Sequence, residues 1–160
     1  MALSSKFGSF NTTTGVATST VVISDVGFQP VAILFWWSGR TESTDTVGRA
    51  THYRGFGVAT GASDRYSIVT NSVDAAATSD TQSANSVAAC ILSVDGTPAI
   101  DGLVDVQSFD SGGFTLVIDD QMPISFRVHY LALGGSSLTN ANAITFSEPN
   151  ATGNQDITGF

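Results

Sequence analysis

Short stretches in which hydrophobic and polar residues alternate recur along most of the chain. Alternation with a period of two is typical of β-strands that bury one face. The pattern predicts strands at 16–24, 31–37, 50–60, 65–72, 86–94, 102–109, 113–119, 124–135 and 142–148. Apolar residues at the three-four spacing of an amphipathic helix are not found over any long stretch. The segment 73–86 is polar on all sides and is expected to form a long loop with at most one helical turn.

Turn-forming residues separate these predicted strands. The sequence Asp-Ser-Gly-Gly at 110–113 is expected to join two strands as a hairpin loop, with a glycine at a position of positive φ. About nine or ten short strands with no substantial helix between them predict an all-β protein, an antiparallel β-sandwich with a jelly-roll-like architecture. We expect one domain over residues 1–148, followed by a C-terminal segment, 149–160.

The C-terminal segment repeats features of an earlier stretch. Residues 11–28 and 150–160 both begin with Asn-x-Thr, contain Thr-Gly and end in Gly-Phe. The segment is therefore either a final edge strand of the domain or the start of a second related copy.

The run Val-Ala-Ile-Leu-Phe-Trp-Trp at 31–37 is apolar at every position, as in a strand covered on both faces. Because successive side chains of a strand point to opposite faces, Trp36 and Trp37 cannot form one flat platform. We expect Trp37 in the core. Trp36 needs cover from a loop or from another subunit. Trp36, Tyr53 and Tyr66 are the candidate binding residues, for a subunit contact or for stacking against a sugar.

The net charge of −8, with one lysine and five arginines, argues against nucleic acid as a partner, because phosphate-binding proteins cluster basic residues. The N-terminus lacks the apolar core of a signal peptide. The longest apolar run is far shorter than the roughly 20 residues that cross a bilayer, so no membrane insertion is expected. The single cysteine, Cys90, lies in an apolar stretch and is expected to be a small buried residue.

Catalytic and metal-binding signatures are missing from the sequence. The two histidines, His52 and His129, each precede a tyrosine in an apolar strand and are expected to pack rather than bind metal. The acidic residues are spread through predicted loops. We therefore expect no catalytic residue, no metal, no cofactor and no enzymatic activity. Spacing alone neither supports nor excludes a polysaccharide hydrolase, which needs two carboxylates about 5 to 9.5 Å apart.

The order of short motifs along the chain is distinctive: GFQPVAILFWWSGRT, RGFGVAT, DAAATSDTQS, FDSGGFTLVID and FRVHYLALGG. This order resembles that of structural proteins of tailed bacteriophages, often built from two tandem related halves, over about residues 20 to 135. The resemblance implies a virion component of the tail, fibre, baseplate or capsid surface. Its partners would be other virion proteins and copies of itself, with a trimer as the first expectation. It would be made in the host cytoplasm without a signal peptide and released by lysis. The alternative is a carbohydrate-binding module that adheres to host-surface glycans.

Overall fold

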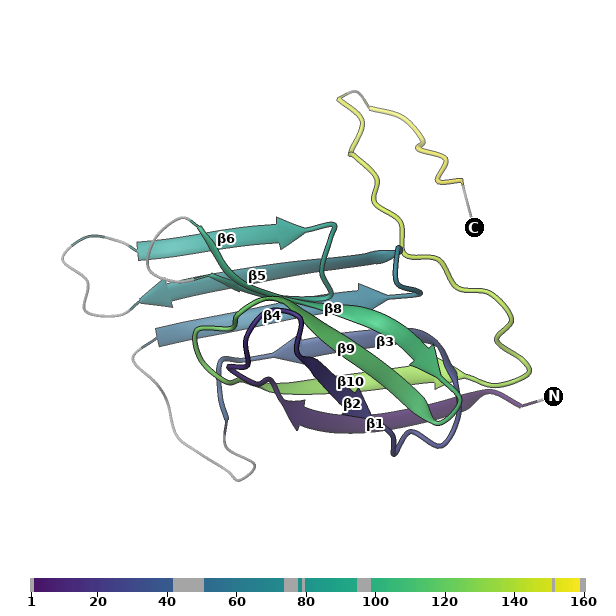
Figure 1. Cartoon of the computed structure of the whole chain (residues 1–160). Helices are drawn as coiled ribbons and strands as arrows, with labels where there is room; N and C mark the ends of the chain where they lie inside the picture. The colour runs from purple at the N-terminus through teal and green to yellow at the C-terminus, as the bar shows by residue number, and fades with distance from the viewer. Residues whose placement is uncertain are drawn as a thin grey trace.

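The computed structural model describes residues 2–41, 51–73, 78, 80–94, 99–150 and 152–158 (Figure 1). Within these residues, ten antiparallel strands form two sheets that pack face to face, and there is no helix. The predicted all-β sandwich is confirmed.

The larger sheet has six strands and the smaller sheet has four. In spatial order, the six-stranded sheet contains β1 (Ser4–Asn11), β10 (Arg127–Gly134), β3 (Pro30–Trp37), β4 (Thr51–Ala59), β5 (Arg65–Val73) and β6 (Asp80–Ser86). The four-stranded sheet contains β2 (Thr20–Ile23), β9 (Gly113–Asp120), β8 (Ile100–Asp110) and β7 (Ile91–Val94). Figure 1 shows β2, β8 and β9 lying across the six-stranded sheet.

Two kinds of connection build this order. Strands β3 to β6 and strands β7 to β9 are meanders in which consecutive strands pair. The pairs β1–β10, β10–β3 and β2–β9 instead join strands that are distant in sequence, as nested pairs do in a jelly roll. The first and last strands of the sandwich therefore lie side by side.

The core fills the space between the two sheets. Along β10, burial alternates at every residue, with Val128, Tyr130 and Ala132 facing inward. The inward residues of β3 are Ile33, Phe35 and Trp37, so the prediction for Trp37 is confirmed. The largest fully buried side chains are Trp37, Tyr130, Phe35, Phe114, Phe126, Ile33, Ile91, Leu92, Leu116, Ile118, Met122 and Val69. At about 25 cal/mol per Å² of buried apolar area, these side chains are the main source of stability.

The sequence pattern missed both edge strands of the six-stranded sheet. Strand β1 was not predicted, and β6 lies inside 73–86, which was expected to be a loop. Their inward positions include Gly8, Gln82 and Ser86, and their sequences show no clear alternation of apolar and polar residues. An edge strand pairs on one side only, so backbone pairing rather than side-chain pattern defines these two strands.

Three predicted strands differ most from the structure. Residues 142–148 form no strand, and 86–94 divides into the end of β6, a turn and β7. The first strand is shorter than predicted, because Thr18 adopts a positive φ of 73°, which the extended conformation excludes. In the C-terminal segment, residues 156–158 form no strand, and 159–160 lie outside the described residues. The last strand of the sandwich ends at Gly134.

The hairpin at 110–113 is confirmed, since Asp110 and Gly113 are paired at its end. The expected positive φ is wrong, because neither Gly112 nor Gly113 adopts one. Gly113 is required for a different reason: a Cβ there would lie 1.8 Å from the carbonyl oxygen of Ile23 in the neighbouring β2. Close approach of two backbones, rather than turn conformation, therefore selects glycine at this position.

Candidate functional site

The face of the six-stranded sheet that points away from the core, called here the outer face, is rich in aromatic and apolar side chains. Its central row runs across four strands, where His129, Trp36, Phe56 and Ile68 are successive register partners. Phe56 is 44% exposed and Ile68 is 53% exposed. Large apolar side chains left in water on adjacent strands indicate a contact surface.

A second row lies beside the first, one outward position further along each strand. Its members are Phe7, Leu131, Leu34, Val58 and Tyr66, which are register partners across β1, β10, β3, β4 and β5. The two rows together carry apolar or aromatic side chains across five neighbouring strands.

The rings of Phe7, Trp36 and His129 pack against one another at one end of the outer face. The ring centroids of Trp36 lie 5.6 Å from those of Phe7 and 6.0 Å from those of His129, and Phe7 and His129 are 6.1 Å apart. Offset and tilted ring pairs at these distances are favourable. The Nδ1 atom of His129 is enclosed and has no hydrogen-bond partner within the described part of the chain, so ring packing positions the imidazole. Trp36 is thereby held in one orientation.

Three adjoining concavities, called here the outer-face hollows, cross this face. The first, of about 410 Å³, is lined by Trp36, Arg54, Phe56 and His129 among others. The second, of about 160 Å³, has Arg54, Phe56 and Ile68 in its walls. The third, of about 250 Å³, is lined by Phe56, Ile68, Tyr66 and Thr145 among others. Phe56 belongs to all three, so the hollows form a continuous series from β3 to β5.

The charge of the outer face is opposite to that of the chain. Among the described residues of the six strands, the outward positions include Arg54 and Arg127 and no carboxylate, although the net charge is −8. Asp80, the acid found in these six strands, accepts a hydrogen bond from the inward-facing Gln82. Within the described part of the chain, the guanidinium of Arg54 has neither a hydrogen-bond nor an ion-pair partner.

The structure brings two of the three predicted binding residues to one face. Trp36 and Tyr66 lie on the outer face, but Tyr53 points inward. The hydroxyl of Tyr53 donates to Ser93 Oγ at 2.9 Å and accepts from the backbone N–H of Val94 at 2.9 Å, which connects the two sheets. Burial raises the pKa of Tyr53. Tyr53 therefore cannot share a binding platform with Trp36, whereas the roles predicted for Trp36 and Tyr66 stay predictions.

Sequence reasoning missed Arg54, Phe56 and Ile68 as members of this site. A signal was present in the stretch Arg-Gly-Phe-Gly-Val-Ala at 54–59, where small residues alternate with large ones. The small residues face the core, because a Cβ at Gly55 would lie 2.0 Å from the Trp37 indole and one at Gly57 would lie 1.8 Å from the Cys90 carbonyl oxygen. The large side chains of β4 must then face outward.

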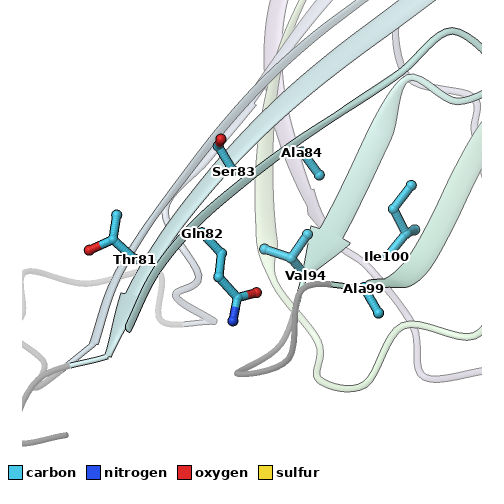
Figure 2. A pocket seen from close by; sticks show the side chains of 7 residues that line it. All are labelled: Thr81, Gln82, Ser83, Ala84, Val94, Ala99 and Ile100. Atoms are coloured by element: carbon cyan, nitrogen blue, oxygen red, sulfur yellow. The ribbon is translucent and has the colours of Figure 1, made fainter. Parts of the chain in front are cut away.

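A separate hollow of about 320 Å³ opens between the sheets, where β6 lies opposite the end of β7 and the start of β8. Figure 2 shows the side chains that line it: Thr81, Gln82, Ser83, Ala84, Val94, Ala99 and Ile100. Gln82 Oε1 is enclosed and lacks a hydrogen-bond partner in the part of the chain that the structure describes. Among the described residues, the lining has neither a charged nor an aromatic side chain, so it offers fewer groups for ligand recognition than the outer face.

A partly buried ion pair joins the two sheets away from the outer face. Arg65 Nε lies 2.6 Å from an Asp105 carboxylate oxygen, and the same Nε–H donates to the Ala88 carbonyl at 3.1 Å. Burial raises the pKa of Asp105 to about 6, although the N–H of Val106 and the guanidinium of Arg65 act in the opposite direction. This ion pair links β5 to β8.

Cys90 is fully buried, as predicted, and its thiol donates to the Val104 carbonyl at 3.4 Å. Among the described residues, no three His, Cys, Asp or Glu side chains gather in a way that could hold a metal ion. The described residues likewise form no helix long and apolar enough to cross a membrane.

Comparison with models of known protein families finds no match, and neither known proteins nor solved structures provide one. The resemblance to phage structural proteins therefore stays a prediction, and a functional proposal rests on the chemistry of the surfaces.

Proposed function

We propose that this chain is a non-enzymatic structural component of a bacteriophage virion, which assembles with copies of itself and with neighbouring virion proteins. The tail, a fibre, the baseplate and the capsid surface are all places where such a component would serve. The protein would be made in the host cytoplasm and released by lysis. The observation that carries the proposal is the C-terminal tail, residues 135–158.

The tail packs little against its own sandwich. It leaves the end of β10 beside the N-terminus, where the N–H of Ser137 donates to the Ala2 carbonyl at 3.2 Å. It then passes the β4–β5 turn, where the N–H of Ala143 donates to Thr60 Oγ1 at 3.2 Å. Beyond this point every described residue to Thr158 is exposed. Figure 1 shows this last part, in yellow, standing apart from the strands.

The exposed part of the tail carries Ile144, Phe146 and Ile157, and Phe146 is 60% exposed. Burial of a large apolar side chain contributes about 1.5–3 kcal/mol, so a second copy that covers these residues would gain stability from them. The six-stranded sheet also has two edge strands, β1 and β6, and no strand among the described residues pairs with their outer sides, where a partner strand could add. The exposed apolar side chains of the tail and the edge strands both support assembly into a symmetric homo-oligomer, and a trimer is the first expectation.

Light scattering coupled to gel filtration tests the assembly. The full chain should elute as a discrete oligomer, and the double variant Ile144→Ser with Phe146→Ser should shift toward the monomer. Val22→Ser is the matched control, because Val22 is 63% exposed on the four-stranded sheet, and it should leave the oligomer intact. A wild-type protein that stays monomeric at high concentration contradicts the assembly.

The virion placement has its own test. Peptides of this chain should be found by mass spectrometry in purified phage particles from the source of the sequence. Their absence from intact particles, with the protein present in the lysate, would remove the virion from the proposal.

A second candidate function is carbohydrate binding in host adhesion. The aromatic walls of the outer-face hollows, Trp36, Phe56 and Tyr66, favour it, because aromatic rings stack against the apolar faces of sugar rings. Folded Trp36→Ala protein should lose binding to host-surface glycans. Unchanged glycan binding in that variant would dismiss the role of Trp36.

A further inference from the structure

We infer that the outer-face hollows bind an acidic saccharide, an oligosaccharide that carries carboxylate, sulfate or phosphate groups. The inference rests on carbohydrate binding, the second candidate function, and adds the ligand class. It combines two properties of this face: exposed aromatic walls and an unbalanced positive charge.

One aromatic wall of the hollows, Trp36, is packed in place before a ligand arrives. Trp36 is held by Phe7 and His129, and its register partner Phe56 lies on the neighbouring strand. Side chains of strand partners lie about 5 Å apart at Cβ, so the walls follow one another across the sheet. Because packing already orders the Trp36 ring, stacking a ligand on it costs little side-chain entropy.

Arg54 supplies the charge recognition. It lines both the first and the second hollow, and its guanidinium has no partner within the described residues. A guanidinium forms two parallel hydrogen bonds with a carboxylate, sulfate or phosphate group. An unpaired arginine between two aromatic-walled hollows can therefore bind an anionic group on a ring that stacks beside it.

The lack of carboxylates at the outward positions of the described strand residues favours an anionic sugar over a neutral one. Hydroxyl groups of a neutral sugar donate as well as accept hydrogen bonds, and carboxylates are the strongest side-chain acceptors. The outward positions of the described strand residues hold no carboxylate, and the guanidinium of Arg54 is the strongest hydrogen-bond donor that lines the hollows. A ligand rich in acceptors fits this set better than one rich in hydroxyl donors.

The position of Arg54 on the outer face matters for binding an anionic ligand, because the rest of the protein repels anions. With a net charge of −8, the chain offers few surfaces where an anionic polymer can approach. The outer face is such a surface. A second copy of the chain would also bring carboxylates to it, but a flat protein surface would leave three concave hollows unfilled.

Isothermal titration calorimetry tests the inference by measuring the affinity for three probes. These are a polygalacturonate oligosaccharide, a heparin oligosaccharide and neutral maltohexaose. We expect an acidic probe to bind about tenfold or more tightly than the neutral one, the effect of one charge-assisted contact. Nuclear magnetic resonance provides the site readout, because the acidic probe should shift the indole N–H signal of Trp36 and leave that of the buried Trp37 in place.

Two variants test the positive charge of Arg54: one removes it and the other offsets it. Arg54→Gln deletes the guanidinium, and Thr70→Asp places a carboxylate on the exposed register partner of Arg54. Each should weaken binding of the acidic probe by about tenfold. Lys6→Gln, on β1 away from the hollows, and Val22→Asp, on the four-stranded sheet, are the matched controls and should bind like the wild type.

Three results overturn the inference. Equal binding of maltohexaose and the acidic probes leaves carbohydrate binding standing but removes the acidic ligand. Failure of all three probes to bind folded protein removes the saccharide altogether. Loss of self-association in Thr70→Asp, with no effect on saccharide binding, assigns the face to a second copy. None of these results depends on the tail variants that test assembly.

Discussion

Trp36 and Trp37 are adjacent in the sequence and face opposite sides of β3. Trp37 is 2% exposed and lies against the backbone of Gly55, whereas Trp36 stacks with His129 on the outer face at 6.0 Å. One residue of the pair therefore stabilises the sandwich, and the other belongs to the surface proposed to bind a ligand.

Replacement of the two tryptophans should have unequal effects on stability. Trp37→Ala leaves a cavity between the sheets and should lower the free energy of unfolding by about 3–5 kcal/mol. Trp36→Ala removes ring contacts at the surface and should cost about 1 kcal/mol. Urea unfolding followed by circular dichroism measures both values. Equal losses would contradict the opposite placement of the two rings.

Gly57 should not tolerate a side chain. Its Cα passes so close to the β7 side of the core that a Cβ would lie 1.8 Å from the backbone oxygen of Cys90. Gly57→Ala should therefore reduce the free energy of unfolding by on the order of 2–3 kcal/mol, as other overpacking changes do. Gly61→Ala is the control, because a Cβ there meets open space. A thermal unfolding midpoint for Gly57→Ala that matches the Gly61→Ala midpoint would refute the close approach.

Asp105 should make the protein more stable as the pH falls. Its folded-state pKa of about 6 lies above the ordinary value of 3.8, so the folded state favours the protonated carboxyl. Its contribution to stability is fully present below pH 3.8 and is lost as the pH rises through 6. The charged groups that act on this carboxyl are Arg65 and Asp119, and the Cys90 thiol lies near it.

The expected change in the free energy of unfolding is modest. Each pKa unit corresponds to about 1.4 kcal/mol, and screening by solvent reduces the effect, which leaves on the order of 1 kcal/mol between pH 7.5 and pH 5. Urea unfolding at the two pH values measures it. The other carboxylates also respond to pH, so Asp105→Asn is the reference, and its stability should change less with pH. Identical pH dependence in both proteins would rule out a raised pKa for Asp105.

The Cys90 thiol should be unreactive in the folded protein. Burial raises its pKa well above 9.0, and only the thiolate reacts with aromatic disulfide reagents. Modification at pH 8 should therefore follow the rate of unfolding and become fast in denaturant. Rapid labelling of the native protein would show that the thiol is accessible.

The candidate site was partly predictable from the sequence. The period-two geometry of a strand over 31–37 separated Trp36 from Trp37, and it placed Trp36 on a face that needs cover. Tyr53 could not be placed in the same way, because its neighbours Arg54, Gly55 and Phe56 do not show which face is buried until the sheets are packed. The same uncertainty hid Phe56, since glycine rather than a large apolar residue occupies the inward positions of β4.

By itself, the sequence determined that this protein is a β-sandwich and which residues of its central strands are buried. Period-two alternation is a local property, so it is readable wherever a strand buries one face. Only the tertiary structure decided that Ser4–Asn11 and Asp80–Ser86 are edge strands, that residues 142–148 form no strand, and that Arg54 lies between aromatic walls. These features depend on which strands become neighbours, and hydrogen bonds between residues far apart in the chain set that order.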